Sequence, residues 1–240
     1  DITNYVMHEL GQPMHAFDYD TLDGQSLFVR QAGKGERLHA LDGKTYALTA
    51  QDLVIADAKQ PVAIAGVMGG EGTGTTEATT HVVFECATFD PISVRQTARA
   101  LSLYSDSQQL FEKGLSPDAL PMALARAIRL AEEFCGARVA SPVVDVYSRK
   151  AKPLSFFFSP EDVNARMGIS LSSAEQKRIL TSLVFTLKKA PKGFRVSVPF
   201  WRDHDIENAV DFTEEIARIY GFHRLPAVLV SGNYDVLFRP

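Results

Sequence analysis

The sequence has 240 residues, of which 45% are hydrophobic and 22% charged, with a formal net charge of -4. This composition predicts a sizeable core in one large domain or two unequal ones. The lack of an excess of Lys and Arg argues against extensive electrostatic binding of nucleic acid but allows a local contact. Membrane-span and signal-peptide patterns are absent from the sequence, and the two cysteines fit neither a disulfide framework nor a metal quartet, so we expect a cytoplasmic protein.

Short strands separated by turns are predicted along the first third of the chain. Asp42-Gly43 between two alternating segments is a hairpin signal, and the apolar run HVVFECATF predicts a buried strand. The predicted strands cover residues 26–31, 37–41, 45–50, 52–57, 61–66 and 81–89.

Helices follow these strands. Asp90 as N-cap and Pro91 at the first position predict a helix over 91–100. Helical spacing predicts another over 122–136, ended by Gly136, and a strand is expected over 141–148. The predicted apolar face of the second helix consists of Met122, Ala125, Ile128, Leu130, Ala131 and Phe134.

A smaller second part is expected after the charged stretch 148–153. Ser159 before Pro160 predicts a helix ended by Gly168, and Ser172 with Glu175 forms a capping box. Strands are expected over 154–159 and 194–198, and helices over 160–168, 172–185 and from the N-cap Asp205 to Gly221; Ile179, Leu180, Leu183 and Val184 form the buried face of the second helix, and Ile206, Val210, Ile216 and Tyr220 that of the third.

His15 lies in the stretch GQPMHAFD, directly after a Gly-Gln-Pro turn. Two interpretations stay open: the imidazole packs at the edge of the turn, or the turn fixes it at the rim of a pocket where it positions a polar substrate. A metal site shared with His8 is disfavoured, because the turn separates the two histidines.

Two further segments suggest a binding pocket. The stretch GVMGGEGTG lacks the Lys-Ser/Thr ending of a phosphate-binding loop, and its glycines indicate either close backbone approach of a flat ligand or a tight turn. Glu85 lies inside an apolar run, so either the strand is solvated there or the carboxylate awaits a donor such as a ligand hydroxyl. The polar run 104–109 is most simply a solvated loop.

Acidic residues gather near the end of the chain. Asp211, Glu214 and Glu215 share one side of a predicted helix. With Asp205 they suggest a hard cation such as Mg²⁺ or a basic partner. The alternative is a solvated acidic helix start supported by the helix dipole and Arg218.

Several segments, in the same order as in the family, resemble the bacterial phenylalanyl-tRNA synthetase beta subunit, and together they extend over nearly all of the chain. They are TNYVMHELGQPMHAFD, LVIAD, AGVMGGE, VVFECATFDP and VPFWRDHDIENAVDFTEEIARIYGFHRLP. The resemblance implies an α+β fold: a mixed-sheet B3/B4 editing domain over 1–150, a small winged-helix-like B5 domain over 151–226, and the start of a linker at 227–240. We therefore expect a fragment of a longer protein, without the aminoacylation domain.

The resemblance also implies an activity, the hydrolysis of tyrosine wrongly attached to the phenylalanine tRNA, with no cofactor required. His15 and the backbone at Gly69 and Gly70 would carry the reaction, and Asp205, Asp211, Glu214 and Glu215 would hold Mg²⁺ shared with the partner subunit. The whole enzyme would be a heterotetramer with an alpha subunit that charges tRNA(Phe) using ATP. The implied substrate-binding residues are Thr3, Asn4, Ala65, Gly66, Glu85, Ser105 and Ser107.

Departures from the family pattern leave a second interpretation open. Ser107 replaces a usual Ala, Ser105 replaces Thr, Leu110 and Lys113 replace Arg, and the Trp201-Arg202 spacing is one residue longer than usual. The alternative is thus a non-catalytic scaffold for subunit assembly with a degenerate pocket. DNA binding by the winged-helix-like part is disfavoured, because its final helix is acidic.

Overall fold

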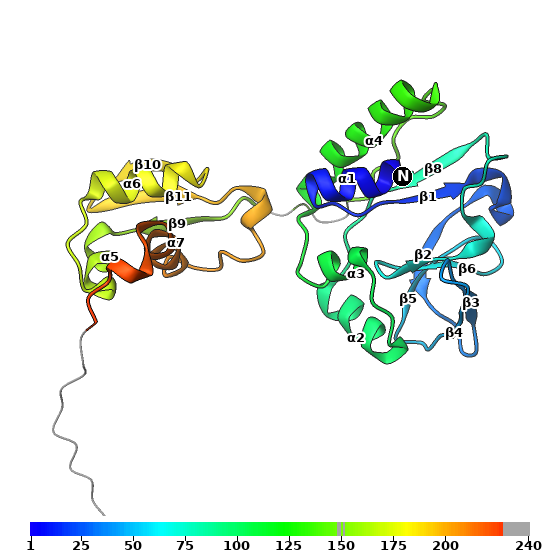
Figure 1. The fold of residues 1–240 in the computed structure, drawn as a ribbon, viewed down its shortest axis with the longest axis horizontal. Helices are drawn as coiled ribbons and strands as arrows, with labels where there is room; N and C mark the ends of the chain where they lie inside the picture. Colours follow the sequence, from blue (N-terminus) through cyan, green and yellow to red (C-terminus); the bar gives the residue numbers. More distant parts are fainter. Residues whose placement is uncertain (148–149, 151, 228–240) are drawn as a thin grey trace, which may run out of the picture. The chain divides into compact units, whose positions relative to one another are not determined.

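The computed structural model describes residues 1–147, 150 and 152–227 and divides into two compact units, Asp1–Arg149 and Lys150–Pro240 (Figure 1). Each unit combines helices with antiparallel strands, which confirms the predicted α+β class. None of the helices within the described residues is long and apolar enough to cross a membrane.

Three small antiparallel sheets form the frame of unit 1. The hairpin predicted at Asp42-Gly43 is confirmed, with Gly43 at φ 76. The first sheet pairs β1 (His15–Asp18) with β8 (Val82–Glu85), the second has the order β2 (Phe28–Gln31), β5 (Leu53–Ala56), β6 (Pro61–Ile64) and β7 (Met68–Gly69), and the third pairs β3 (Arg37–His39) with β4 (Thr45–Ala47).

Four α-helices cover these sheets: α1 (Ile2–Leu10), α2 (Pro91–Leu101), α3 (Asp106–Phe111) and α4 (Leu120–Cys135). The predicted N-cap of α2 is confirmed, since the Asp90 carboxylate accepts from the Ser93 amide at 2.8 Å. Helices α1 and α4 lie side by side (Figure 1), and Val6 of α1 packs against Ala123 and Ala127 of α4. Short 3-10 turns occur in unit 1 at Tyr19–Thr21, Asp23–Gln25, Glu71–Thr73 and Pro117–Ala119, and in unit 2 at Phe200–Arg202 and Phe222–Arg224.

Three expectations for unit 1 are wrong. Strand β8 is not buried along its length, because Val82 at its start is 47% exposed. Helix α4 turns its small alanines toward α1, so Met122 and Phe134 of the predicted apolar face are exposed. Residues 141–147 form no strand and 141–146 are exposed, while Ser148 lies outside the described residues.

In the described part of unit 2, three helices pack on one face of a three-stranded antiparallel sheet. Phe158 of the sheet, Ile179 and Phe212 are among its fully buried side chains. The sheet has the order β10 (Thr186–Ala190), β11 (Gly193–Ser197) and β9 (Ser155–Phe158), and the helices are α5 (Pro160–Met167), α6 (Ser173–Ser182) and α7 (Asp211–Tyr220). This arrangement agrees with the expected winged-helix-like architecture.

Two helix boundaries in unit 2 differ from the prediction. Helix α6 ends at Ser182, because Val184 adopts φ 68 and leads into β10; Val184 is 60% exposed rather than buried. Helix α7 begins at Asp211 rather than after Asp205, and Val210 is accordingly exposed. The Asp211 carboxylate accepts from the amides of Glu207 and Asn208 at 2.8 Å, which stabilises this later start.

Candidate functional site

The β1–β8 ladder brings together the two side chains that the sequence singled out separately. His15 is directly paired with Glu85 in the antiparallel register. Beside this pair lies a cavity of about 360 Å³. Of the predicted site residues, Thr3, Asn4, His15, Gly66, Gly69, Glu85, Ser105 and Ser107 line the cavity, whereas Ala65 and Gly70 do not.

The His15 ring is held between an aromatic side chain and a glycine. It packs edge-on against Phe17, with ring centroids 4.5 Å apart, and a Cβ at Gly69 would overlap it. Burial lowers the pKa of His15, so the ring is neutral near pH 7. Its Nε2 is buried without a hydrogen-bond partner, which favours the pocket interpretation over a satisfied turn residue.

Glu85 is a buried carboxyl group with an unused acceptor. Its Oε1 has no hydrogen-bond partner, and burial raises the pKa of the carboxyl from 4.5 to about 7. A neutral His15 cannot compensate its charge. Within the part of the chain that the structure describes, the cavity walls contain no Lys or Arg. A hydroxyl donor entering the cavity would therefore supply the missing bond.

The glycine segment behaves as a wall rather than as a set of amide donors. A Cβ at Gly66, which has φ +69, would lie 2.8 Å from the Phe89 ring, so close packing excludes a side chain there. The Gly70 amide donates to the Val62 carbonyl at 2.8 Å. The expectation that Gly70 stabilises an oxyanion is therefore wrong, because its N–H is already used.

Ala65 also lies behind the cavity rather than on its surface. It is 3% exposed in the core beneath the wall, and its amide donates to Leu53. The cavity lining therefore gives no support to a ligand contact at Ala65, which stays a prediction.

The polar run 104–109 is structured rather than a solvated loop. Ser105 is the N-cap of α3: its hydroxyl accepts from the Gln108 amide at 3.0 Å and donates to the Val67 carbonyl at 2.7 Å. These bonds fasten α3 to the glycine segment. Ser107, in the first turn of α3, is thereby positioned in the cavity wall.

The apolar part of the cavity lining was not predicted from the sequence. Phe89 and Phe111 form a T-shaped pair with centroids 5.0 Å apart, and Met14 and Leu41 add aliphatic surface. The available signal was the helical spacing of Ser107 and Phe111, which places both on one face of α3. The cavity lining thus combines apolar side chains with several polar groups that could orient a ligand.

The acidic residues of unit 2 do not form the expected metal site. Glu215 is held by two guanidinium groups, with Arg202 at 3.0 Å and Arg218 at 2.7 Å, and Arg202 also pairs with Asp205. Asp211 is engaged by backbone amides. Among the described residues, no three His, Cys, Asp or Glu side chains are arranged to hold a metal ion. Arginines or backbone amides already engage Asp205, Asp211 and Glu215, so the set Asp205, Asp211, Glu214 and Glu215 does not fit Mg²⁺.

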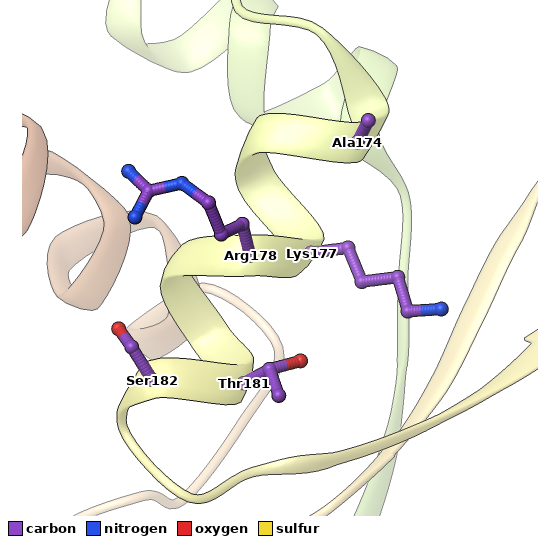
Figure 2. Close-up of a pocket in the computed structure, with 5 residues that line it drawn as sticks. All are labelled: Ala174, Lys177, Arg178, Thr181 and Ser182. Carbon is purple, nitrogen blue, oxygen red and sulfur yellow. The ribbon is translucent and has the colours of Figure 1, made fainter.

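Besides the cavity of unit 1, a surface pocket lies on one face of α6 in unit 2 (Figure 2). Ala174, Lys177, Arg178, Thr181 and Ser182 line it, and Arg178 is already paired with Glu175 at 2.6 Å. It contains none of the predicted site residues. The cavity of unit 1 is therefore the better candidate.

Comparison with known proteins identifies both units. A family model described as B3/4 domain matches residues 1–136, and one described as tRNA synthetase B5 domain matches residues 156–222. The phenylalanine–tRNA ligase beta subunit of Moorella thermoacetica is 44% identical over 97% of this chain and 29% of its own length. That of Geobacter metallireducens is 40% identical over 95% of this chain and 29% of its own length.

The chain thus spans less than a third of the length of these curated relatives. The crystal structure of an N-terminal fragment of the phenylalanyl-tRNA synthetase beta subunit from Pyrococcus horikoshii is also similar, with 16% sequence identity and a TM-score of 0.46. The match covers 89% of this chain and 62% of that one. This likeness is too distant to bear on the site.

Proposed function

This chain belongs to the phenylalanyl-tRNA synthetase beta-subunit family, and we propose that the cavity of its first unit hydrolyses tyrosine wrongly esterified to the phenylalanine tRNA. The observation that carries this proposal is Glu85, a buried carboxyl group that lines the cavity and whose Oε1 has no hydrogen-bond partner. A tyrosine phenol supplies the donor that Glu85 lacks, and a phenylalanine ring does not. A site built to bind a hydroxyl discriminates strongly against the analogue without it.

His15 supplies the second polar contact. Its unpartnered Nε2 orients the ester or a hydroxyl of the terminal ribose, while Glu85, on the neighbouring strand, binds the phenol. The imidazole and the carboxyl belong to directly paired residues of the ladder and both line the cavity, so one aminoacyl group in the cavity can contact both. Its aromatic ring would pack against apolar lining residues and the side-chain-free surface of Gly66 and Gly69.

In the proposed reaction a water molecule attacks the ester carbonyl carbon. The bond from this carbon to the ribose oxygen then breaks, which releases tyrosine and the free tRNA hydroxyl. Thr3, Asn4, Ser105 and Ser107 border the cavity, but none is a general base, so we assign water activation to the tRNA's own terminal hydroxyl. With Gly70 excluded, the backbone amide at Gly69 is the candidate for stabilising the developing oxyanion.

The wider setting is part of the same proposal. We propose that the chain acts within a phenylalanine–tRNA ligase whose beta subunit assembles with an alpha subunit. That enzyme would charge tRNA(Phe) with phenylalanine using ATP. The fragment would bind the acceptor end of the tRNA locally, in keeping with its net charge of -4.

Deacylation of Tyr-tRNA(Phe) and Phe-tRNA(Phe) by the 240-residue chain and by the two-subunit enzyme tests the proposal. We expect Tyr-tRNA(Phe) to be cleaved faster, and Glu85→Ala to reduce this preference at least about tenfold, because the phenol loses its acceptor. Glu77→Ala removes an exposed carboxylate outside the cavity and is the control. An unchanged ratio in Glu85→Ala rejects the assigned role, and no cleavage of either substrate favours the scaffold alternative.

A further inference from the structure

We propose that Gln12 is a positioning residue, whose side-chain amide replaces a missing rung of the β1–β8 ladder and so fixes His15 against Glu85. The inference goes beyond the proposed function in assigning a role to a side chain outside the cavity. It rests on that function only for its binding measurement.

The ladder stops at the very pair that faces the cavity. His15↔Glu85 is its last matched pair, and two residues further along each strand the same register would pair Pro13 with Ala87. Proline has no N–H and cannot donate a ladder bond. Without a substitute donor, the strands would separate next to His15 and Glu85.

The Gln12 amide supplies that donor. Its Nε2 donates to the Pro13 carbonyl at 3.0 Å and to the Ala87 carbonyl at 2.9 Å. These carbonyls belong to Pro13 and Ala87, the pair that the register would bring together two residues beyond His15 and Glu85. One side-chain nitrogen therefore joins both strands where the backbone cannot.

The environment of Gln12 indicates that this bridge matters. The residue is 1% exposed, and its Oε1 is buried without a partner. An apolar side chain of equal length would avoid that unpaired acceptor, but it would lose both donors. We infer that the cost of the unpaired Oε1 is offset by the strand spacing that the bridge maintains at the cavity. Pro13, Met14, His15 and Glu85 all line that cavity.

Gln176 in unit 2 provides a matched control. It is also fully buried with an unpartnered Oε1, and its Nε2 donates to Asn164 at 2.9 Å and to Leu171 at 3.1 Å. It belongs to the other unit and does not line the cavity. Replacing it removes an equivalent internal bridge without touching the β1–β8 pair.

The experiment compares Gln12→Met with Gln176→Met in the 240-residue chain. Calorimetry measures binding of tyrosinamide and phenylalaninamide, and NMR follows titration of the His15 ring. We expect Gln12→Met to weaken tyrosinamide binding about tenfold. We also expect the pKa of His15 to rise toward its ordinary value, because the loosened rim admits water. Gln176→Met should change neither.

A Gln12→Met variant with wild-type binding and an unchanged His15 titration overturns the proposal. If that variant fails to fold, Gln12→Asn replaces it, since the shorter amide keeps its polarity but cannot reach both carbonyls; an unchanged His15 titration in this variant is equally fatal. The two proposals fail separately. Equal binding of tyrosinamide and phenylalaninamide by the wild type rejects the editing function, while the His15 titration still decides the role of Gln12.

Discussion

Two buried carboxyl groups, Glu85 in unit 1 and Glu215 in unit 2, have opposite surroundings. Glu85 lies among apolar neighbours with an oxygen that has no partner, and burial raises its pKa to about 7. Burial also acts to raise the pKa of Glu215, but hydrogen bonds and charge from Arg218 and Arg202 outweigh it and lower that pKa to about 2.

This difference separates a structural carboxylate from one available to a ligand. Glu215 joins the segment carrying Arg202 to helix α7, and its carboxylate already has hydrogen-bond partners. Glu85 costs free energy of folding until something donates to it. Strongly perturbed groups of the second kind concentrate at functional sites, so cavity and carboxyl together identify the site better than either alone.

Breaking the Glu215 network should give the largest effect. Arg202→Met removes the guanidinium that contacts both Glu215 and Asp205, leaving a buried carboxylate half compensated. We expect the free energy of unfolding of unit 2 to fall by about 3–5 kcal/mol. Urea denaturation followed by Trp201, the only tryptophan of the chain, measures it.

The matched control is Arg178→Met on the exposed face of α6 (Figure 2), whose pair with Glu175 is solvent-accessible. This variant should lose much less stability than Arg202→Met, because solvent screens an exposed pair. Equal losses in the two variants would remove the distinction between the buried network and an ordinary surface pair.

Replacing Glu85 should have the opposite sign. In the folded chain Glu85 keeps its proton up to about pH 7, whereas in the unfolded chain it ionises above 4.5. The wild type therefore loses stability as pH rises between these values and loses none below them. Glu85→Gln removes this term, so its stability relative to wild type should increase by about 3 kcal/mol from pH 4 to pH 8.

Hydrogen exchange of the β1 and β8 amides across that pH range measures this difference in unit 1. Asp90→Asn, which changes an exposed N-cap carboxylate of α2, controls for general pH effects. A difference between Glu85→Gln and wild type that does not vary with pH would mean that Glu85 is compensated much as Glu215 is.

The sequence predicted elements whose signals are local. Asp90 before Pro91, the Asp42-Gly43 turn and Gly168 after α5 were all placed correctly. Strand β1 was missed because HAFD is short and its pairing with β8 is a long-range contact. Helix α1 was missed because it buries only Val6 and Met7 and depends on packing against α4.

Site residues followed the same division. Glu85 could be found from sequence because a carboxylate inside an apolar run is chemically anomalous. Its proximity to His15 could not be found, since ladder register is a tertiary property. Gly70 and Glu215 were misassigned for the same reason: the Val62 carbonyl and the Arg202 guanidinium that engage them are supplied by the fold.

The smallest expected effect concerns Ser107, another residue of the cavity lining. Its hydroxyl must lose water when an aromatic ring packs against that lining. We expect Ser107→Ala to tighten tyrosinamide binding by about 1 kcal/mol, roughly fivefold, measured by calorimetry. Ser105→Ala is the control: because its hydroxyl caps α3, it should cost about 1 kcal/mol of stability without tightening binding. Weaker binding by Ser107→Ala would instead mean that the hydroxyl is a polar partner of the ligand. Recognition would then not depend on Glu85 alone, and the contrast between Glu85 and the paired Glu215 would explain only part of it.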